Sequence, residues 1–262
     1  MPLLHERRGA VAILTLSRPE ARNAWGEDYN TALKELLPQL EDDPAVRAVV
    51  LTGDDRGGAF SAGANIKDPQ THTSNSIGEF IESLPKRRRF QAMNLITDFS
   101  KPIVAAVNGY AVGIGCIVTY CCDLIVASEK AEWRLPQVGL GILPAQGGTV
   151  RLARWVGRGV AMRVAMGFPL KAEEAYRAGL AQWLVPHEEL MAKALEVAEH
   201  IAGLPPLATR LAKEAVNFGL DVPLREAANA DLYRFMALEL TEDKAESHRA
   251  WRERRKPEIK GR

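Results

Sequence analysis

Glycines between a predicted strand and a predicted helix are the residues of this chain best placed to present backbone N–H groups to a ligand. The β-branched run at 103–107 has the length and composition of a buried strand, and the apolar run at 116–122 is typical of a buried helix. Gly113 and Gly115 give the connecting segment a backbone freedom that bulky residues lack. Because the start of a helix leaves N–H groups unpaired, this arrangement favours binding of an anion, or of an oxyanion that forms during a reaction.

Two interpretations of this segment involve no binding site. Residues 102–122 carry no charge, and a run of 21 residues is long enough to span a bilayer. However, Pro102, Asn108 and three glycines interrupt the run, and no cluster of basic residues flanks it, which argues against a transmembrane segment. The other interpretation is an ordinary core strand and helix, and the rest of the chain has to decide against it.

A second loop has the same character as the first. The segment 59–67, A-F-S-A-G-A-N-I-K, follows a predicted strand at 46–52, and its small residues let the backbone approach a ligand closely. One N–H from this loop and one from the turn at 113–115 could converge on a single carbonyl oxygen. Two such donors held in a dry site stabilise a developing oxyanion by about 3 kcal/mol each.

The composition argues against several classes of function. With 262 residues, 47% of them hydrophobic and 26% charged, the chain is an ordinary globular protein that can bury a substantial core. A net charge of +1 gives no support for binding nucleic acid or an anionic membrane. The three cysteines lie in the apolar run at 116–122 and predict buried thiols in a reducing compartment. The N-terminal residues show no signal-peptide pattern, which predicts a cytoplasmic location.

Motifs for metals and dinucleotides are not found in the sequence. The five histidines show no pairing at metal-ligand spacing, so we expect no metal site. The segment 109–115, G-Y-A-V-G-I-G, does not fit the dinucleotide fingerprint, and we expect no nicotinamide cofactor.

The elements that must position the two loops alternate between strands and helices. The patterning predicts strands at 11–17, 46–52, 103–107, 124–127, 131–134 and 182–185. It predicts helices at 27–40, 79–99, 116–122, 147–155, 159–166, 172–178, 189–202, 206–218, 223–240 and 242–254. The basic run at 86–89 is expected on a solvated helix face, and 53–63 is expected to be a loop. Together these elements predict an α/β core followed by a mainly helical C-terminal region.

Five short segments, in this order, resemble signatures of one known family. They are S-R-P-E-A-R-N-A at 17–24, F-S-A-G-A-N-I-K at 60–67, N-G-Y-A-V-G-I-G-C at 108–116, L-P-A-Q-G-G-T at 143–149, and T-E-D-K-A-E-S-H-R-A-W-R-E-R-R-K-P at 241–257. The family that they resemble is the crotonase (enoyl-CoA hydratase/isomerase) superfamily. The resemblance extends over nearly the whole chain.

The resemblance implies a fold, an assembly and a ligand. The fold would be a crotonase-like spiral of ββα units over residues 1–200, with a helical region at 201–262 that serves oligomerisation and closure of the coenzyme A site. The assembly would be a homotrimer or a dimer of trimers, and the ligands would be acyl-CoA thioesters of the kind met in fatty acid metabolism. Coenzyme A would enter only as part of the substrate, with no further cofactor.

The resemblance also assigns roles to particular residues. The backbone N–H groups of Ala64 and Ile114 would form the oxyanion hole, and Ile114 stands where the family usually has glycine. The expected coenzyme A contacts are the backbones of Ala24, Ala62 and Ile66, the side chain of Lys67 near the phosphates, and Trp251 and Arg254, which in the family often come from a neighbouring subunit. A simpler role for Trp251 is packing of the last helix.

The departures from the family pattern concern proton transfer. Hydratases of this family use two glutamates as base and acid, and the resemblance places them at Ile117 and Gln137. Some relatives use an aspartate near Ala145 or Gln146, which are also neutral. None of these four side chains can exchange a proton near neutral pH, and a positioned acid or base contributes roughly 10²–10⁴ in rate. We therefore expect hydration of ordinary enoyl-CoA to be very slow.

Several reactions remain open for such a site. A lyase, isomerase, decarboxylase or hydrolase reaction could rely on the oxyanion hole alone or on a substitute group such as His72, Glu79 or Glu82, although each of these is typical of a solvated surface. Gln137 and Gln146 could orient a water or a polar acyl substituent, or could simply line the pocket. An alternative of a different class is a non-catalytic acyl-CoA binding protein.

Overall fold

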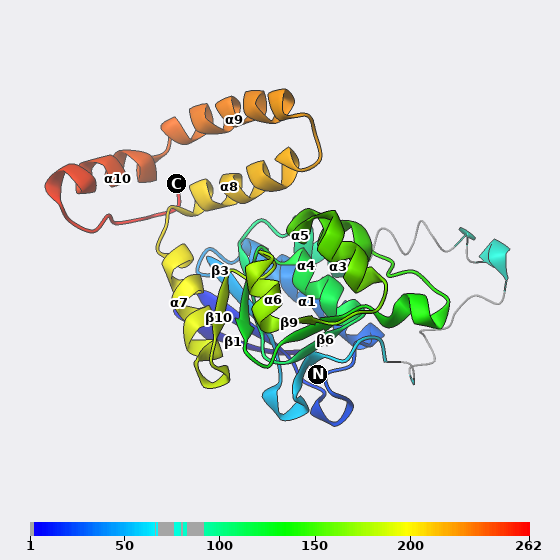
Figure 1. The fold of residues 1–262 in the computed structure, drawn as a ribbon. Helices are drawn as coiled ribbons and strands as arrows, with labels where there is room; N and C mark the ends of the chain where they lie inside the picture. Colours follow the sequence, from blue (N-terminus) through cyan, green and yellow to red (C-terminus); the bar gives the residue numbers. More distant parts are fainter. Residues whose placement is uncertain (1–2, 66, 68–75, 80, 83–91) are drawn as a thin grey trace.

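The computed structural model describes residues 3–65, 67, 76–79, 81–82 and 92–262. Figure 1 shows a core of strands and helices, with three helices near the C terminus extending to one side. The strands are β1 (Leu3–Arg8), β2 (Val11–Leu16), β3 (Ala48–Gly53), β4 (Ala59–Ser61), β5 (Ile103–Val107), β6 (Tyr110–Val112), β7 (Leu124–Ser128), β8 (Glu132–Arg134), β9 (Leu170–Lys171) and β10 (Trp183–Val185). The α-helices are α1 (Glu27–Asp42), α3 (Ala92–Asp98), α4 (Ile114–Cys121), α5 (Gly148–Ala165), α6 (Ala172–Arg177), α7 (Leu190–Ala202), α8 (Pro206–Gly219), α9 (Leu224–Glu239) and α10 (Glu242–Glu253).

The strands form two sheets of different size. The larger sheet has the order β1-β2-β3-β5-β7-β10, with β1 antiparallel to β2 and all other neighbours parallel. The smaller sheet has the order β4-β6-β8-β9, and only β9 is antiparallel to its neighbour. The central strands β3 and β5 are buried along their whole length, as their β-branched and small residues require.

The chain moves between the two sheets in a repeated order. β3, β5 and β7 lie in the larger sheet, and each is followed by a strand of the smaller sheet, β4, β6 and β8. The second and third of these pairs lead into α4 and α5. This succession of two strands and a helix fits the spiral of ββα units that the resemblance implies.

Two hydrophobic clusters hold the layers together. The main cluster fills the space between the two sheets and helices α1, α3 and α4, and its fully buried members include Trp133 and Phe60. The second cluster lies between the other face of the larger sheet and α7, through residues such as Val104 and Leu195. Burial on both faces explains why the parallel strands are continuously apolar rather than alternating.

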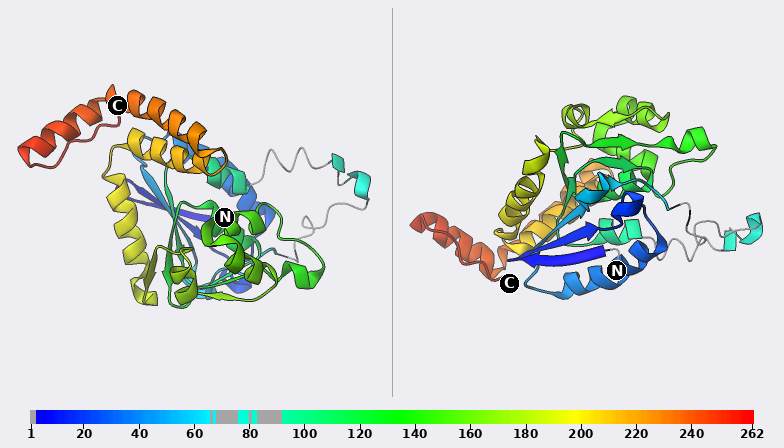
Figure 2. Two further views of the ribbon diagram at one scale, coloured as in Figure 1. Left: turned by 45° about the horizontal axis from the view of Figure 1, so that its top comes forward. Right: turned by 90° about the horizontal axis from the view of Figure 1, so that it is seen from below.

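Helices α8 to α10 extend beyond the core (Figures 1 and 2). The ammonium group of Lys213 on α8 lies 2.8 Å from the carboxylate of Asp123, and both side chains are largely buried. Asp123 also accepts a hydrogen bond from the N–H of Ile103 at 2.7 Å, so the ion pair fastens α8 to the end of the larger sheet. Beyond this anchor, α9 and α10 expose large apolar side chains, among them Leu224 and Tyr233.

The predicted elements are mostly confirmed, with some corrections. The segment 53–63, predicted to be a loop, contains the short strand β4, and the turn after β5 contains β6. The patterning also missed β1 and β9, while the helices predicted at 147–155 and 159–166 form one element, α5, kinked at Gly157. The predicted helix at 79–99 ends as α3, and most of its length, with the basic run at 86–89, lies outside the described residues.

Candidate active site

The first candidate loop leaves β4 and runs beside the segment that precedes α1. The N–H of Trp25 donates to the carbonyl of Gly63 at 2.7 Å, and the N–H of Asn65 donates to the carbonyl of Trp25 at 2.8 Å. These two bonds form an isolated parallel bridge between Trp25 and Ala64. In such a bridge the middle residue directs its own N–H and carbonyl to the opposite side. The N–H of Ala64 therefore points away from Trp25.

A buried asparagine fixes the start of this loop. Asn23 has no exposed surface and a positive φ of 56°, a backbone conformation that asparagine adopts more readily than most residues. Its amide donates to the carbonyls of Asp54 and Ala59 at 2.9 and 2.8 Å, and its side-chain oxygen accepts from the N–H of Arg18 at 3.0 Å. The asparagine thus joins the 18–25 segment to both ends of the turn before β4.

The carboxylate of Asp54 stabilises the same turn. It accepts hydrogen bonds from the N–H of Arg56 at 3.1 Å and from the hydroxyl of Ser17 at 2.8 Å. These bonds and the ion pair with the Arg56 guanidinium hold the pKa of Asp54 well below its ordinary value. The turn that precedes β4 is therefore held in place by a carboxylate that stays ionised at neutral pH.

The second candidate loop joins β6 to α4. Gly113 caps the helix with φ 54° and ψ −112°, a conformation that is strained for any residue with a side chain. No side chain caps this end of α4. The first N–H groups of the helix therefore have no partner within it, and the helix dipole makes this end favourable for negative charge.

Helix α4 is held against two neighbouring strands of the smaller sheet, β6 and β8. The Cys116 sulfur lies 2.8 Å from the carbonyl oxygen of Ala111 on β6 and 3.2 Å from that of Arg134 on β8. The hydroxyl of Thr119 accepts a hydrogen bond from the indole N–H of Trp133 at 3.0 Å. Burial raises the pKa of the Cys116 thiol to about 12, so it is a structural hydrogen-bond donor and not a nucleophile.

The two loops meet where their glycines lie. A Cβ atom added to Gly115 would lie only 2.6 Å from the carbonyl oxygen of Ser61, and one added to Gly63 would lie 3.0 Å from the carbonyl oxygen of Val112. Glycine is thus required twice for the backbones to approach each other so closely. Among the hydrogen bonds formed by the described residues, none uses the N–H of Ala64 or of Ile114. The contact places two unused backbone donors on adjoining loops.

Neutral side chains stand at the two positions where the resemblance places glutamates. Ile117 follows Ile114 by three residues on the same face of α4, is only 4% exposed, and lies against Gly148. The amide nitrogen of Gln137 lies 3.1 Å from the point where a Cβ of Gly113 would be, so this side chain reaches the start of α4. The amide oxygen of Gln137 is buried and has no hydrogen-bond partner in the described part of the chain. A ligand or a water with a hydrogen to donate would satisfy it.

Most of the remaining candidate residues are exposed. Gln146 is exposed, with a positive φ of 56°, and lies in the turn that precedes α5. Ala145 is exposed as well. Glu79 and Glu82 are exposed, and His72 lies outside the described residues. Among the described residues, no group of three or more His, Cys, Asp or Glu side chains is arranged to hold a metal ion.

The predicted coenzyme A contacts fall into two groups. Ala24 and Ala62 lie next to the first loop, where the N–H of Ala62 donates to the carbonyl of Arg22 at 2.9 Å. Lys67 is exposed, and its N–H donates to the side chain of Asn65 at 3.2 Å. Ile66 lies outside the described residues.

Trp251 and Arg254 form the second group, at the far end of α10. Trp251 is 82% exposed, so it does not serve to pack the last helix within its own chain. Figures 1 and 2 show α10 extending away from the strands and from α4. These two residues are therefore not brought to the loops of the same chain.

The sequence interpretation did not single out Asn23 or recognise the strands β4 and β6. A signal for the asparagine was present, because asparagine is enriched at positive φ and stands in the 17–24 motif between a predicted strand and helix. The two strands have three residues each, which is too short for a periodic pattern.

Among the described residues, no helix is both long and apolar enough to cross a membrane. The structure divides the apolar run at 102–122 among β5, β6 and the short helix α4.

Comparison with known proteins gives one consistent result. The family described as Enoyl-CoA hydratase/isomerase matches residues 6–262. The mitochondrial enoyl-CoA hydratase of Pongo abelii is 36% identical, over 98% of this chain and 87% of the relative. The 2,3-dehydroadipyl-CoA hydratase of Escherichia coli is also 36% identical, over 99% of each chain. The crystal structure of an enoyl-CoA hydratase from Bacillus anthracis superimposes with a TM-score of 0.91 at 31% identity, covering 100% of both chains.

Proposed function

Since the chain belongs to the enoyl-CoA hydratase/isomerase family, with the α/β fold of the crotonase superfamily, we propose that it binds an acyl-CoA thioester and polarises the thioester carbonyl with the N–H groups of Ala64 and Ile114. Negative charge that develops on the carbonyl oxygen is stabilised by both donors at once. Removal of a group from the α-carbon then produces an enolate that the same two donors hold.

The observation that carries this proposal is the interlocking of the two loops. Gly115 and Gly63 allow contacts with Ser61 and Val112 that no other residue would permit. Loops held this closely keep both donors in position before the substrate arrives, so no reorganisation is needed in the transition state. Such preorganisation supports an enzyme over a protein that only binds thioesters.

The reaction is proposed to be one that depends mainly on stabilising the enolate. With Ile117 and Gln137 at the two glutamate positions, the site holds no general acid or base there. Decarboxylation of a malonyl-type thioester releases carbon dioxide and needs no protein base, and other lyase, isomerase or hydrolase reactions would need a substitute group. Several relatives carry the name of hydratases, but two-glutamate hydration is not proposed here.

The proposed coenzyme A site combines residues of two chains. The backbones of Ala24, Ala62 and Ile66 and the ammonium group of Lys67 contribute from the chain that holds the acyl group. Trp251 and Arg254 contribute from a neighbouring copy, because α10 lies away from the loops of its own chain. This requires a homotrimer or a dimer of trimers, which the large apolar side chains exposed on α9 support.

The test is incubation with a panel of acyl-CoA thioesters, followed by mass spectrometry. We expect a malonyl-type thioester to lose carbon dioxide, and crotonyl-CoA to gain water far more slowly than with family hydratases. Hydration of crotonyl-CoA at rates typical of the family would overturn the account of Ile117 and Gln137. Binding of the thioesters without any turnover would instead favour the non-catalytic protein.

A double variant separates these outcomes. The substitutions Ile117→Glu and Gln137→Glu together supply the missing acid and base, and we expect hydration to rise by roughly 10²–10⁴-fold, the contribution of positioned proton transfer. Each single variant is the matched control, because one carboxylate cannot serve both steps. If the folded double variant still binds thioesters and gains no hydration, the two loops do not polarise the carbonyl as proposed.

A further inference from the structure

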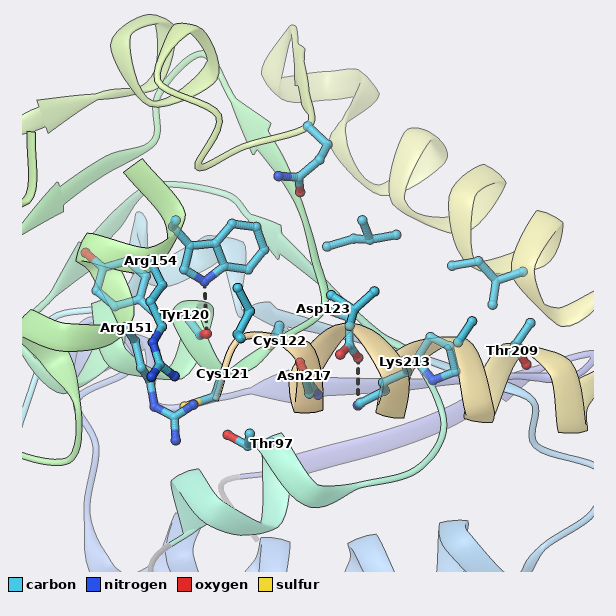
Figure 3. Close-up of a pocket in the computed structure, with 18 of the residues that line it drawn as sticks. Thr97, Tyr120, Cys121, Cys122, Asp123, Arg151, Arg154, Thr209, Lys213 and Asn217 are labelled. Carbon is cyan, nitrogen blue, oxygen red and sulfur yellow. Dashed lines mark hydrogen bonds and ion pairs between the residues drawn. The ribbon is translucent and has the colours of Figure 1, made fainter. Parts of the chain in front are cut away.

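A cavity of about 660 Å³ lies at the other end of α4 from the candidate oxyanion hole. It is bounded by the last turn of α4, by α5 and by α8 (Figure 3). Its volume falls within the roughly 300–1,000 Å³ typical of ligand sites. Ile114 begins α4 and Cys121 ends it, which separates the two sites by about 10 Å along the helix.

The walls of this cavity are mainly apolar. The side chains that line it include those of Tyr120, Trp155, Ile201, Leu204 and Val216. The indole N–H of Trp155 donates to the carbonyl of Tyr120 at 3.2 Å, which holds this wall in place. An aliphatic chain would find continuous apolar contact here.

The charges in the lining do not cancel. The cavity is lined by three cations, Arg151, Arg154 and Lys213, and by two carboxylates, Asp123 and Asp221, which leaves one positive charge in excess. Lys213 pairs with Asp123 at 2.8 Å, and Arg154 pairs with Asp221 at 2.6 Å.

Arg151 is the one of these three cations that has no carboxylate partner among the described residues. Its side chain is partly buried, packs over Gly147 and forms no hydrogen bond or ion pair with the described residues. It lies close enough to Cys121 to act on the thiol electrostatically, and Figure 3 shows it projecting from α5 toward the end of α4 and Thr97. Asp98, an acidic side chain that also acts on Cys121, is exposed and does not line the cavity.

We propose that this cavity is a second binding site, which takes an aliphatic carboxylate with its charged end on Arg151 and its chain between α5 and α8. A guanidinium group binds a carboxylate through two parallel hydrogen bonds, and partial burial strengthens them. The carboxylate has two possible sources, a free fatty acid or the far end of a dicarboxylic acyl thioester bound at the oxyanion hole. Only the second source rests on the proposed function.

The first test measures the binding of octanoate to the full chain by calorimetry. We expect saturable binding of octanoate, and weaker binding of octan-1-ol, which has the same chain without the charge. The variant Arg151→Gln should weaken octanoate binding by about 10-fold to 100-fold, the loss of a charge-assisted hydrogen-bonded pair. The matched control is Arg158→Gln on the same helix, because Arg158 is exposed and outside the cavity lining, and its affinity should be unchanged.

A second variant keeps the test decisive if Arg151→Gln fails to fold. Val216→Trp adds a large side chain on the exposed face of α8 that borders the cavity, and it should abolish octanoate binding. The proposal is overturned if octanoate does not bind, if octan-1-ol binds as tightly, or if Arg151→Gln binds octanoate with unchanged affinity. It is also overturned if a second copy covers the cavity, so that octanoate binds only after the assembly is dissociated.

The two sources are separated by comparing octanoyl-CoA with octanedioyl-CoA. If the natural carboxylate belongs to the thioester, Arg151→Gln weakens the binding of octanedioyl-CoA and leaves octanoyl-CoA unchanged. If it belongs to a free acid, the variant affects octanoate alone and octanoate does not compete with either thioester. Failure of the proposed function would appear differently, as intact octanoate binding without any turnover of thioesters.

Discussion

The substitution Gly115→Ala tests whether the close contact of the two loops is what positions the proposed donors. The new Cβ would lie 2.6 Å from the carbonyl oxygen of Ser61 and 3.0 Å from its Cβ. A carbon–oxygen contact of about 3.3 Å is the closest that is ordinarily tolerated, so the backbones must separate by about 0.7 Å. Both neighbouring atoms belong to short, anchored segments, and no flexible side chain can absorb the change.

The magnitude follows from the geometry of an oxyanion hole. Its donors act at about 2.7–3.1 Å from the oxygen, and a shift of about 0.7 Å moves one of them out of that range. Loss of one donor lowers kcat by roughly 10²–10³-fold. The same overpacking should lower the free energy of unfolding by about 1–3 kcal/mol, which a domain of ordinary stability survives.

The assay is turnover of the best thioester from the panel, measured together with urea unfolding. Gly159→Ala is the matched control, because a Cβ at Gly159 would meet nothing within 4 Å and the residue lies within α5. It should retain full activity and gain up to about 1 kcal/mol of stability. A folded Gly115→Ala protein with unchanged kcat would refute the idea that this contact sets the position of the donors.

Three further predictions concern the surroundings of the site and the C-terminal region. Asn23→Ala removes three hydrogen bonds, two of them buried, and the residue suited to a positive φ. The free energy of unfolding should therefore fall by about 3–4 kcal/mol in urea denaturation. A fall no larger than that of an exposed substitution would contradict this role. The guanidinium groups of Arg255 and Arg249 hold the pKa of Glu246 well below its ordinary value of 4.5. Because the folded pKa is the lower one, this carboxylate stabilises the fold above pH 4.5, and its contribution is lost as the pH falls below that value. Glu246→Gln should therefore flatten the loss of stability in acid, and an unchanged acid profile would count against the pair. Burial raises the pKa of the Cys116 thiol, which does not line the cavity. A thiol reagent at neutral pH should therefore modify Cys116 only in denaturant, and rapid modification of Cys116 in the folded protein would show that α4 opens.

The sequence predicts those parts of the fold in which apolar residues recur at a regular spacing or form a sufficiently long run. β5 and the helices from α7 onward match their predicted ranges closely, because each buries a regular pattern of side chains. The three-residue strands β4 and β6 carry no such pattern, and they form because the chain crosses from one sheet to the other at those points. They could not be predicted from local sequence.

Some features of the candidate site can likewise be predicted from the sequence, and others depend on the tertiary fold. Residue types at Ile117 and Gln137 can be read from the sequence, and the absence of a carboxylate at both positions is certain from it. The contact of Gly115 with Ser61 depends on two segments that are more than 50 residues apart in the sequence. The unpaired state of Arg151 also depends on the tertiary fold, because each carboxylate in that cavity is already paired with another cation.

In the proposed site, the hydrocarbon of Ile117 that packs against Gly148 stands on one wall of the pocket in place of a proton donor. A product that acquires a hydrogen at the α-carbon would have to take it from water, because neither Ile117 nor the amide of Gln137 donates a proton near neutral pH. A reaction run in deuterium oxide would then label the product at that carbon directly from the solvent, without an acid of the protein's own.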